Sequence, residues 1–273
     1  ISIILILLFV FSVLSVPVCH GVISGLYLYG MKIFPGLFIS FILTNILVRI
    51  LQQKNINNPW ILVITGLMTG FPNGAYICSW YNKNNPENRL GDMLAGIINI
   101  PSPAFLISYV YINILEKCIS LPMFLALTYT PVILCSYMAI LLFRDKNNKK
   151  DNAPHIKNDK KLIFHFFEEA VDSSINTALK LGAYVIIFSV IVNIIMHFSQ
   201  SNTAGLLISY LFEISNGLAI IKNAGIPMNI TVLLTVLLDA FGGVCIIMQT
   251  KSICSSYISI KKYIYQKLVL CIV

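Results

Sequence analysis

Long apolar stretches without charge follow one another along most of this chain. Each is longer than the roughly 20 residues that cross the ~30 Å hydrocarbon layer of a bilayer. Their apolar residues run consecutively and do not alternate with polar ones, as they would in the strands of a membrane barrel. The pattern therefore predicts an all-α polytopic membrane protein, with charge-free stretches at 1–31, 55–82, 93–115, 118–143 and 181–212.

The apolar blocks predict nine helices, about eight of them transmembrane, at 1–19, 22–50, 59–80, 91–115, 119–143, 163–198, 203–222, 228–250 and 256–273. The first block lacks the basic start and the small-residue cleavage site of a signal peptide, so we expect a first transmembrane helix there. The block 163–198 begins amphipathic and becomes wholly apolar only after Lys180. Its first part is therefore expected to lie at the membrane interface.

Composition supports this class and divides the chain in two. The sequence is 57% hydrophobic and only 11% charged, which excludes an ordinary soluble domain and a disordered chain. The segment 144–161 holds seven basic and three acidic residues. Basic loops between apolar segments are typically cytoplasmic, and this loop lacks the interleaved aromatic residues of a nucleic-acid site. We expect two membrane halves, 1–143 and 162–273, joined by the basic linker 144–161.

Glycine and proline interrupt several predicted spans. The interruptions are Gly70, Pro72 and Gly74 in the first half, then Pro101 and Pro103, and Gly242-Gly243 in the second half. Proline removes a helix donor, and glycine lowers helix propensity by about 1 kcal/mol. A broken helix in lipid leaves backbone groups unpaired unless protein, water or a ligand satisfies them. Paired breaks therefore indicate a binding site.

The interruptions also suggest an internal, inverted repeat. Residues 71–75 align with 241–245 at an offset of 170, and Lys32 aligns with Lys180 at an offset of 148. The two offsets differ because the second half is expected to contain an extra helix, at 203–222. Matched interrupted segments in two halves are typical of the binding site of a transporter.

A substrate site is expected where the first interruption starts a new half-helix. The free N–H groups and the positive helix end at Asn73, Gly74 and Ala75 suit an anionic or polar group. Gly242-Gly243 is the expected counterpart. The alternative is a kink that lets two helices pack closely. Asn99, Ser102 and Pro103 complete the candidate substrate-binding residues, beside Gly70, Pro72 and Gly242-Gly243.

Ionisable residues in apolar surroundings are functional candidates because they are costly in a membrane. Lys32, Lys180, Glu213 and Asp239 meet this description. The two lysines alternatively extend to the membrane interface. Asp239 directly precedes the glycine pair, and Glu213 is a candidate for pairing with a lysine or binding a coupling proton. No hydrolase, metalloprotease or phosphate-loop motif occurs, and the His and Cys residues are isolated, so no enzyme, metal or cofactor is expected.

Two motifs resemble those of the YlbJ family of sporulation integral membrane proteins, within the nucleoside-recognition (Gate) domain group. Gly70, Phe71, Pro72, Gly74 and Ala75 match its G-[YF]-P-x-G-A turn. Asn99, Pro103 and Phe105 match its N-x-x-N-P-x-F motif, in which Ser102 here takes the place of the second Asn. The likeness extends over about residues 21–270.

This resemblance implies transport of dipicolinic acid, a small anionic metabolite, across the outer forespore membrane of a spore-forming bacterium. The alternatives are a nucleoside or other Gate-type solute transporter, and a scaffold that recruits partners through the linker. The expected partners are the lipid bilayer and a small anionic solute, with homo-oligomer formation left open.

Overall fold

The computed structural model describes residues 5, 9, 11–54, 58–86, 89–142, 160–199, 203–254 and 257–273, which form helices and no strand. The basic linker predicted at 144–161 lies outside the described residues up to Asp159. In chain order the elements are α2 (Ser15–Tyr27), the π-helical η1 (Leu28–Ile33), α3 (Phe34–Lys54), α4 (Pro59–Thr69), α5 (Asn73–Asn84), α6 (Leu90–Ile98), α7 (Pro103–Phe105), η2 (Leu106–Ile114), α8 (Leu121–Leu142), α9 (Lys160–Ser199), α10 (Thr203–Phe212), α11 (Ile214–Asn223), α12 (Met228–Phe241), α13 (Gly243–Cys254) and α14 (Ile260–Ile272).

The protein is an integral membrane protein. Four described helical segments are long and apolar enough to cross a bilayer, and a fifth joins them if the bent pair Ser15–Ile33 and Leu37–Leu51 is one span. Their outer faces are apolar: on α8, Leu134, Met138 and Leu142 are 53%, 55% and 74% exposed. Such faces suit lipid and not water. The four segments are Leu90–Ile114, Leu121–Leu142, Phe167–Ser199 and Met228–Cys254.

The eight predicted spans are not confirmed, because two of the predicted blocks are divided into short helices. Block 59–80 becomes α4 and α5, and block 203–222 becomes α10 and α11. At 1.5 Å per residue, the 11 residues of α4 and the 10 of α10 each reach only about 16 Å. Neither crosses a ~30 Å layer alone.

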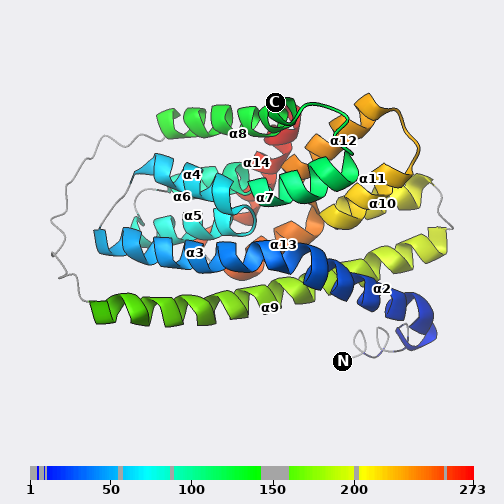
Figure 1. The fold of residues 1–273 in the computed structure, drawn as a ribbon, viewed down its shortest axis with the longest axis horizontal. Helices are drawn as coiled ribbons and strands as arrows, with labels where there is room; N and C mark the ends of the chain where they lie inside the picture. The colour runs from blue at the N-terminus through cyan, green and yellow to red at the C-terminus, as the bar shows by residue number, and fades with distance from the viewer. Residues whose placement is uncertain are drawn as a thin grey trace.

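These short helices form two hairpins at opposite ends of the molecule. The arms α4 and α5 pack against each other, as do α10 and α11. In Figure 1, α8 and α9 run along the long axis; the α4–α5 hairpin lies toward one end of it, and the α10–α11 hairpin toward the other. The turns of both hairpins therefore lie in the interior, between the long helices.

The first helices of the chain pack closely against a long helix of the second half. Both α2 and α3 contact α9. The contact depends on Gly21 and Gly25, one turn apart on α2. A Cβ on Gly21 would lie 2.5 Å from the Val190 Cα, and a Cβ on Gly25 would lie 2.8 Å from the Ile186 Cα. Small residues at this spacing let membrane helices approach backbone to backbone. Asn45 of α3 adds a hydrogen bond to the Ser174 hydroxyl (3.2 Å).

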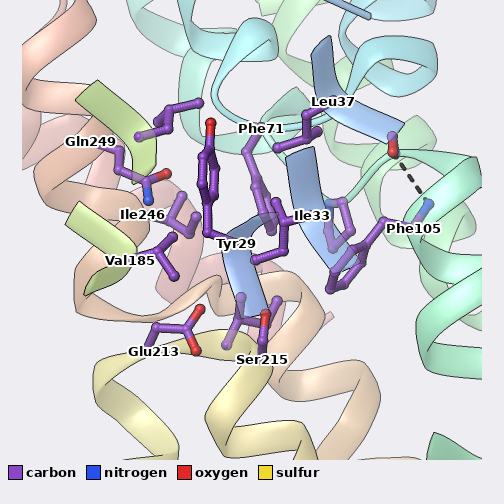
Figure 2. A pocket seen from close by; sticks show the side chains of 14 residues that line it. Tyr29, Ile33, Leu37, Phe71, Phe105, Val185, Glu213, Ser215, Ile246 and Gln249 are labelled. Carbon is purple, nitrogen blue, oxygen red and sulfur yellow. Dashed lines mark hydrogen bonds between the residues drawn. The ribbon is translucent and has the colours of Figure 1, made fainter. Parts of the chain in front are cut away.

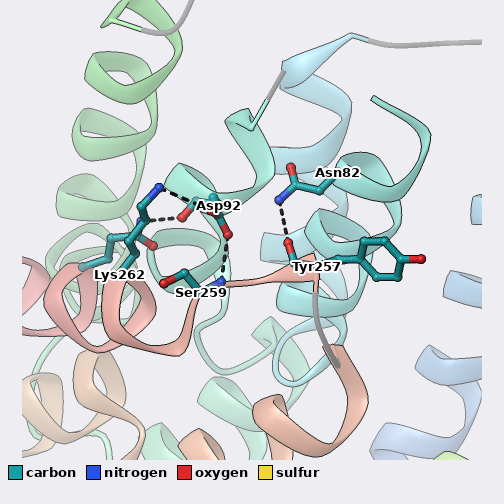
Figure 3. A network of polar contacts seen from close by, with 6 residues as sticks. Asn82, Asp92, Tyr257, Ser259 and Lys262 are labelled. Atoms are coloured by element: carbon teal, nitrogen blue, oxygen red, sulfur yellow. Dashed lines mark hydrogen bonds and ion pairs between the residues drawn. The ribbon is translucent and has the colours of Figure 1, made fainter. Parts of the chain in front are cut away.

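The last helix of the chain is attached to the first half by polar contacts. The Asp92 carboxylate of α6 accepts the Ser259 N–H (2.9 Å) and pairs with Lys262 at 3.3 Å (Figure 3). Asn82 of α5 donates to the Tyr257 carbonyl (2.9 Å), and Gln266 donates to the Asp92 carbonyl (2.7 Å). The two predicted halves are thus in contact through α14 as well as through α9.

Gly21→Ala should destabilise the protein by about 1–3 kcal/mol, because the added methyl group meets the α9 backbone. The measurement is thermal unfolding in detergent. Gly30→Ala is the matched control, since a Cβ there meets no atom within 4 Å. Equal midpoints for the two variants would contradict close α2–α9 packing.

Candidate functional site

The first two breaks in the helices lie against each other. Gly70 has a φ of 72°, which favours glycine, and a Cβ there would lie 2.4 Å from the Ser102 nitrogen. The Phe71 N–H donates to the Ile100 carbonyl (2.9 Å). Gly74 is equally confined, since its Cβ would lie 2.7 Å from the Ile98 carbonyl oxygen. Some of the backbone groups freed at 70–72 and 99–102 are therefore satisfied by contacts between these two breaks. This agrees with the alternative interpretation, a kink that lets two helices pack closely.

Two of the three amides expected to bind an anion at the start of α5, those of Gly74 and Ala75, are already hydrogen-bonded within the protein. The Gly74 N–H donates to the Gly70 carbonyl (3.0 Å), and the Tyr76 N–H donates to the Pro72 carbonyl (3.1 Å). The Ala75 N–H donates to Asn99 Oδ1 (3.2 Å). Because these donors are already used, a substrate site made of the amides at Gly74 and Ala75 is not what the structure shows.

Asn99 is a structural junction. Besides accepting from Ala75, its side-chain nitrogen donates to the hydroxyls of Tyr263 (2.8 Å) and Thr250 (3.2 Å). Its side chain is fully buried. One amide thus connects α5, α13 and α14 at the end of α6.

The other two breaks form a second pair. Glu213 is extended and caps α11, its carboxylate accepting the Asn216 N–H (2.7 Å). Gly242 ends α12 with a φ of 83° and donates to the Leu238 carbonyl (2.7 Å). A Cβ on Gly243 would lie 3.2 Å from the Leu211 carbonyl oxygen. The break at Gly242 therefore lies against the break at Glu213.

The break at Glu213 has no glycine or proline at the break itself and was not predicted. Its available signal is the sequence Glu213-Ile214-Ser215-Asn216, where helix-capping and other polar residues interrupt an apolar block. Each such residue offers the backbone an alternative hydrogen bond to the helical one. The block 203–222, predicted as one continuous helix, is therefore interrupted.

A cavity lies where the two pairs of breaks meet. Its volume is about 30 Å³, and Figure 2 shows the side chains that surround it. Three break regions contribute directly, through Phe71, Ser102 and Glu213, and Ile246 lines the cavity from α13, one turn after the fourth break at Gly242. The bend between α2 and α3 and the middle of α9 complete the lining, which comprises Tyr29, Ile33, Leu37, Phe71, Pro101, Ser102, Phe105, Leu181, Val185, Glu213, Ile214, Ser215, Ile246 and Gln249.

Of the predicted site residues, Ser102 and Glu213 line this cavity. Several others shape the surrounding backbone without lining it: Gly70, Pro72, Asn73, Gly74, Ala75, Asn99, Pro103, Gly242 and Gly243. The side chains of Lys32 and Lys180 are exposed and outside the lining. Asp239 is fully buried, away from the lining.

Sequence reasoning missed four polar residues. Tyr29, Ser215 and Gln249 line the cavity, and no sequence motif marks them as site residues. Lys267 is fully buried on α14 and donates to the carbonyls of Asn99 and Ala240. It stands among other lysines near the chain end, so its sequence context indicates a surface residue.

The lining combines apolar walls with a few polar groups. Phe71, Phe105 and aliphatic side chains surround the carboxylate of Glu213, the amide of Gln249 and the hydroxyls of serine residues. Ligand sites typically have this composition, with the polar groups fixing the orientation of an apolar or aromatic body. Among the lining residues, Glu213 is the one charged side chain.

Asn99→Ala should lower the free energy of unfolding by about 2–4 kcal/mol, because three buried hydrogen bonds are lost and their partners are left unsatisfied. Thermal unfolding in detergent measures the change. The control is Asn113→Ala, which removes an exposed amide on η2. A midpoint for Asn99→Ala within error of this control would rule out the junction.

Comparison with known proteins adds no family to this geometry. The resemblance to the YlbJ family, drawn from the residues at 70–75 and 99–105, therefore remains a prediction. No family model, curated protein or solved structure matches the chain.

Proposed function

We propose that this protein is a membrane transporter that carries a small solute through the cavity between its broken helices. The observation that supports this most directly is the convergence of two hairpin turns and two helix breaks on one cavity. Irregular backbone is tolerated inside a membrane where it is buried in protein or lines a cavity. Discontinuous helices of this kind form the solute sites of many transporters.

The order of elements supports an internal repeat. Its two halves align at an offset different from the 170 residues expected from the sequence. Each half contains a long entering helix, a hairpin, a broken helix and a closing helix. An offset of 142 relates Phe71 to Glu213 and Ile100 to Gly242. In this register, 203–222 corresponds to the first hairpin and is no extra helix.

The entering helices keep the offset of 148. It relates Ile33 to Leu181 and Leu37 to Val185, and these residues line the cavity from α2–α3 and α9. The hairpins lie at opposite ends of the long axis, as an inverted repeat requires (Figure 1). In such transporters one repeat moves against the other and opens the site to each side in turn.

The small size of the cavity supports a closed conformation in such a cycle. A volume of about 30 Å³ holds a water molecule or two, whereas sites for organic ligands have roughly 300–1,000 Å³. Loading a solute therefore requires separation of the side chains that line the cavity. The hairpin turns at Phe71 and Glu213 are the elements proposed to move.

The charge of the lining favours a neutral solute with an aromatic ring, such as a nucleoside. Aromatic rings and serine, glutamine and glutamate side chains suit a planar base with hydroxyl groups. Dipicolinate, the solute implied by the motif resemblance, is a dianion. Because the lining offers Glu213 and no lysine or arginine, a dianion requires a protonated Glu213 or an accompanying cation. Dipicolinate transport during sporulation is thus the second candidate.

Uptake into proteoliposomes tests both solutes with one substitution. Glu213→Gln keeps an oxygen acceptor for the Asn216 N–H but removes the charge. For a nucleoside we expect uptake to fall about tenfold or more, since hydrogen bonds to a charged group are worth about 1.5–3 kcal/mol. For dipicolinate we expect uptake to rise, because a like charge is removed.

The matched control is Glu168→Gln, an exposed glutamate on α9, which should transport like the wild type. Labelled uridine and labelled dipicolinate serve as the two solutes, with insertion of each variant verified by gel filtration. Failure of correctly inserted wild-type protein to carry either solute would overturn the two substrate proposals.

A further inference from the structure

A buried lysine joins the ends of two half-helices. Lys267 of α14 donates to the carbonyls of Asn99 and Ala240, the latter at 3.0 Å. The first carbonyl is at the end of α6, and the second is in the last turn of α12. Helix C-termini carry partial negative charge, which an ammonium group stabilises. In sodium-coupled transporters such carbonyl ends coordinate the ion.

Asp239 lies next to this contact. It precedes Ala240 on α12, it is fully buried, and neither of its carboxylate oxygens has a hydrogen-bond partner. Asp239 and Lys267 form no direct ion pair, but their charges interact through the protein. An unpaired carboxylate in such surroundings is costly, and protonation removes the cost. Its chemistry is therefore that of a proton acceptor.

The other groups that face Asp239 are neutral at ordinary pH. Tyr129 of α8 and Tyr210 of α10 interact with it electrostatically, and Cys271 of α14 faces Lys267 and contacts the Leu237 carbonyl. Tyrosine and cysteine ordinarily ionise near pH 10 and about 8.5. α11 contributes Lys222, which pairs with Glu116 at the surface. Asp239 and Lys267 are therefore the two charged groups that interact in this region.

We propose that Asp239 and Lys267 form a proton site that drives transport. In this site the Lys267 ammonium takes the place that a sodium ion occupies in sodium-coupled transporters. The proposal rests on the transport function proposed above. In the resting state the ammonium holds the ends of α6 and α12, and the Asp239 carboxylate balances its charge. Binding of one proton to the carboxylate leaves a net positive charge in an apolar interior.

An unbalanced buried charge favours conformations in which water reaches it. Such a conformation requires α6 and α12 to separate at Lys267. These two helix ends continue directly into the breaks at 99–102 and Gly242, next to the cavity lining of Ser102 and Ile246. Proton uptake is thereby coupled to opening of the cavity, without a sodium ion.

The first test measures what drives accumulation in proteoliposomes, with uridine or dipicolinate, whichever the wild type carries. With one proton per solute, a gradient of one pH unit drives up to about tenfold accumulation. We expect this for the wild type, with no effect of a sodium gradient. Asp239→Asn should lose the response to pH but still exchange labelled for unlabelled solute. Lys261→Gln, an exposed lysine on the same helix, is the control.

The second test needs no solute. Hydrogen–deuterium exchange at 99–102 and 240–243 is followed between about pH 6 and 8 and corrected for the intrinsic pH dependence of exchange. We expect exchange in the wild type and in Lys261→Gln to rise as the pH falls. The double variant Asp239→Asn/Lys267→Gln lacks both charges of this pair, so it should fold and show no such rise.

The outcomes separate the two proposals. Accumulation driven by sodium, or a full pH response in Asp239→Asn, overturns proton coupling at this site and leaves transport intact. Exchange in the wild type that does not depend on pH also overturns it. A pH-dependent opening in a wild type that carries neither solute overturns the two substrate proposals instead.

Discussion

Backbone groups freed by a break in a helix must find partners inside the membrane, and this constraint organises the whole structure. The breaks meet the constraint in pairs. The 70–72 turn lies against 99–102, and Glu213 lies against Gly242-Gly243. Polar side chains complete the pairing: Asn99 accepts a hydrogen bond from an α5 amide, Glu213 caps α11, and Lys267 donates to the carbonyl ends of α6 and α12.

This internal pairing changes how the site is understood. Glycine at positions 70, 74 and 243 serves close backbone contact, so these residues build the framework and leave few free amides for a ligand. In the proposed function, the solute is held by the side chains that lie between the two pairs of breaks. There the charge that matters is the carboxylate of Glu213, whereas the exposed Lys32 and Lys180 lie outside the lining. The framework and the cavity are thus adjacent but made of different residues.

Predictions based on local sequence agreed with the structure where the cause is local. Uninterrupted apolar runs gave helices of membrane length, and the glycine and proline residues at 70–72, 101 and 242 do interrupt them. Predictions that depended on counting or matching were less successful. The break at Glu213 arises from polar capping and not from glycine or proline, so the block 203–222 was predicted as one continuous helix.

The sequence by itself determined the membrane class and three of the four break regions, because apolar length and the conformational limits of proline and glycine act within a few residues. The tertiary structure alone decided which breaks meet, which polar residues face the cavity, and that Lys267 is buried between two helix ends. These properties depend on contacts between residues far apart in the sequence, from 27 positions for Lys267 with Ala240 to 164 for Asn99 with Tyr263. No local pattern encodes the partner of such a contact, since the same lysine or asparagine would be equally at home on a surface.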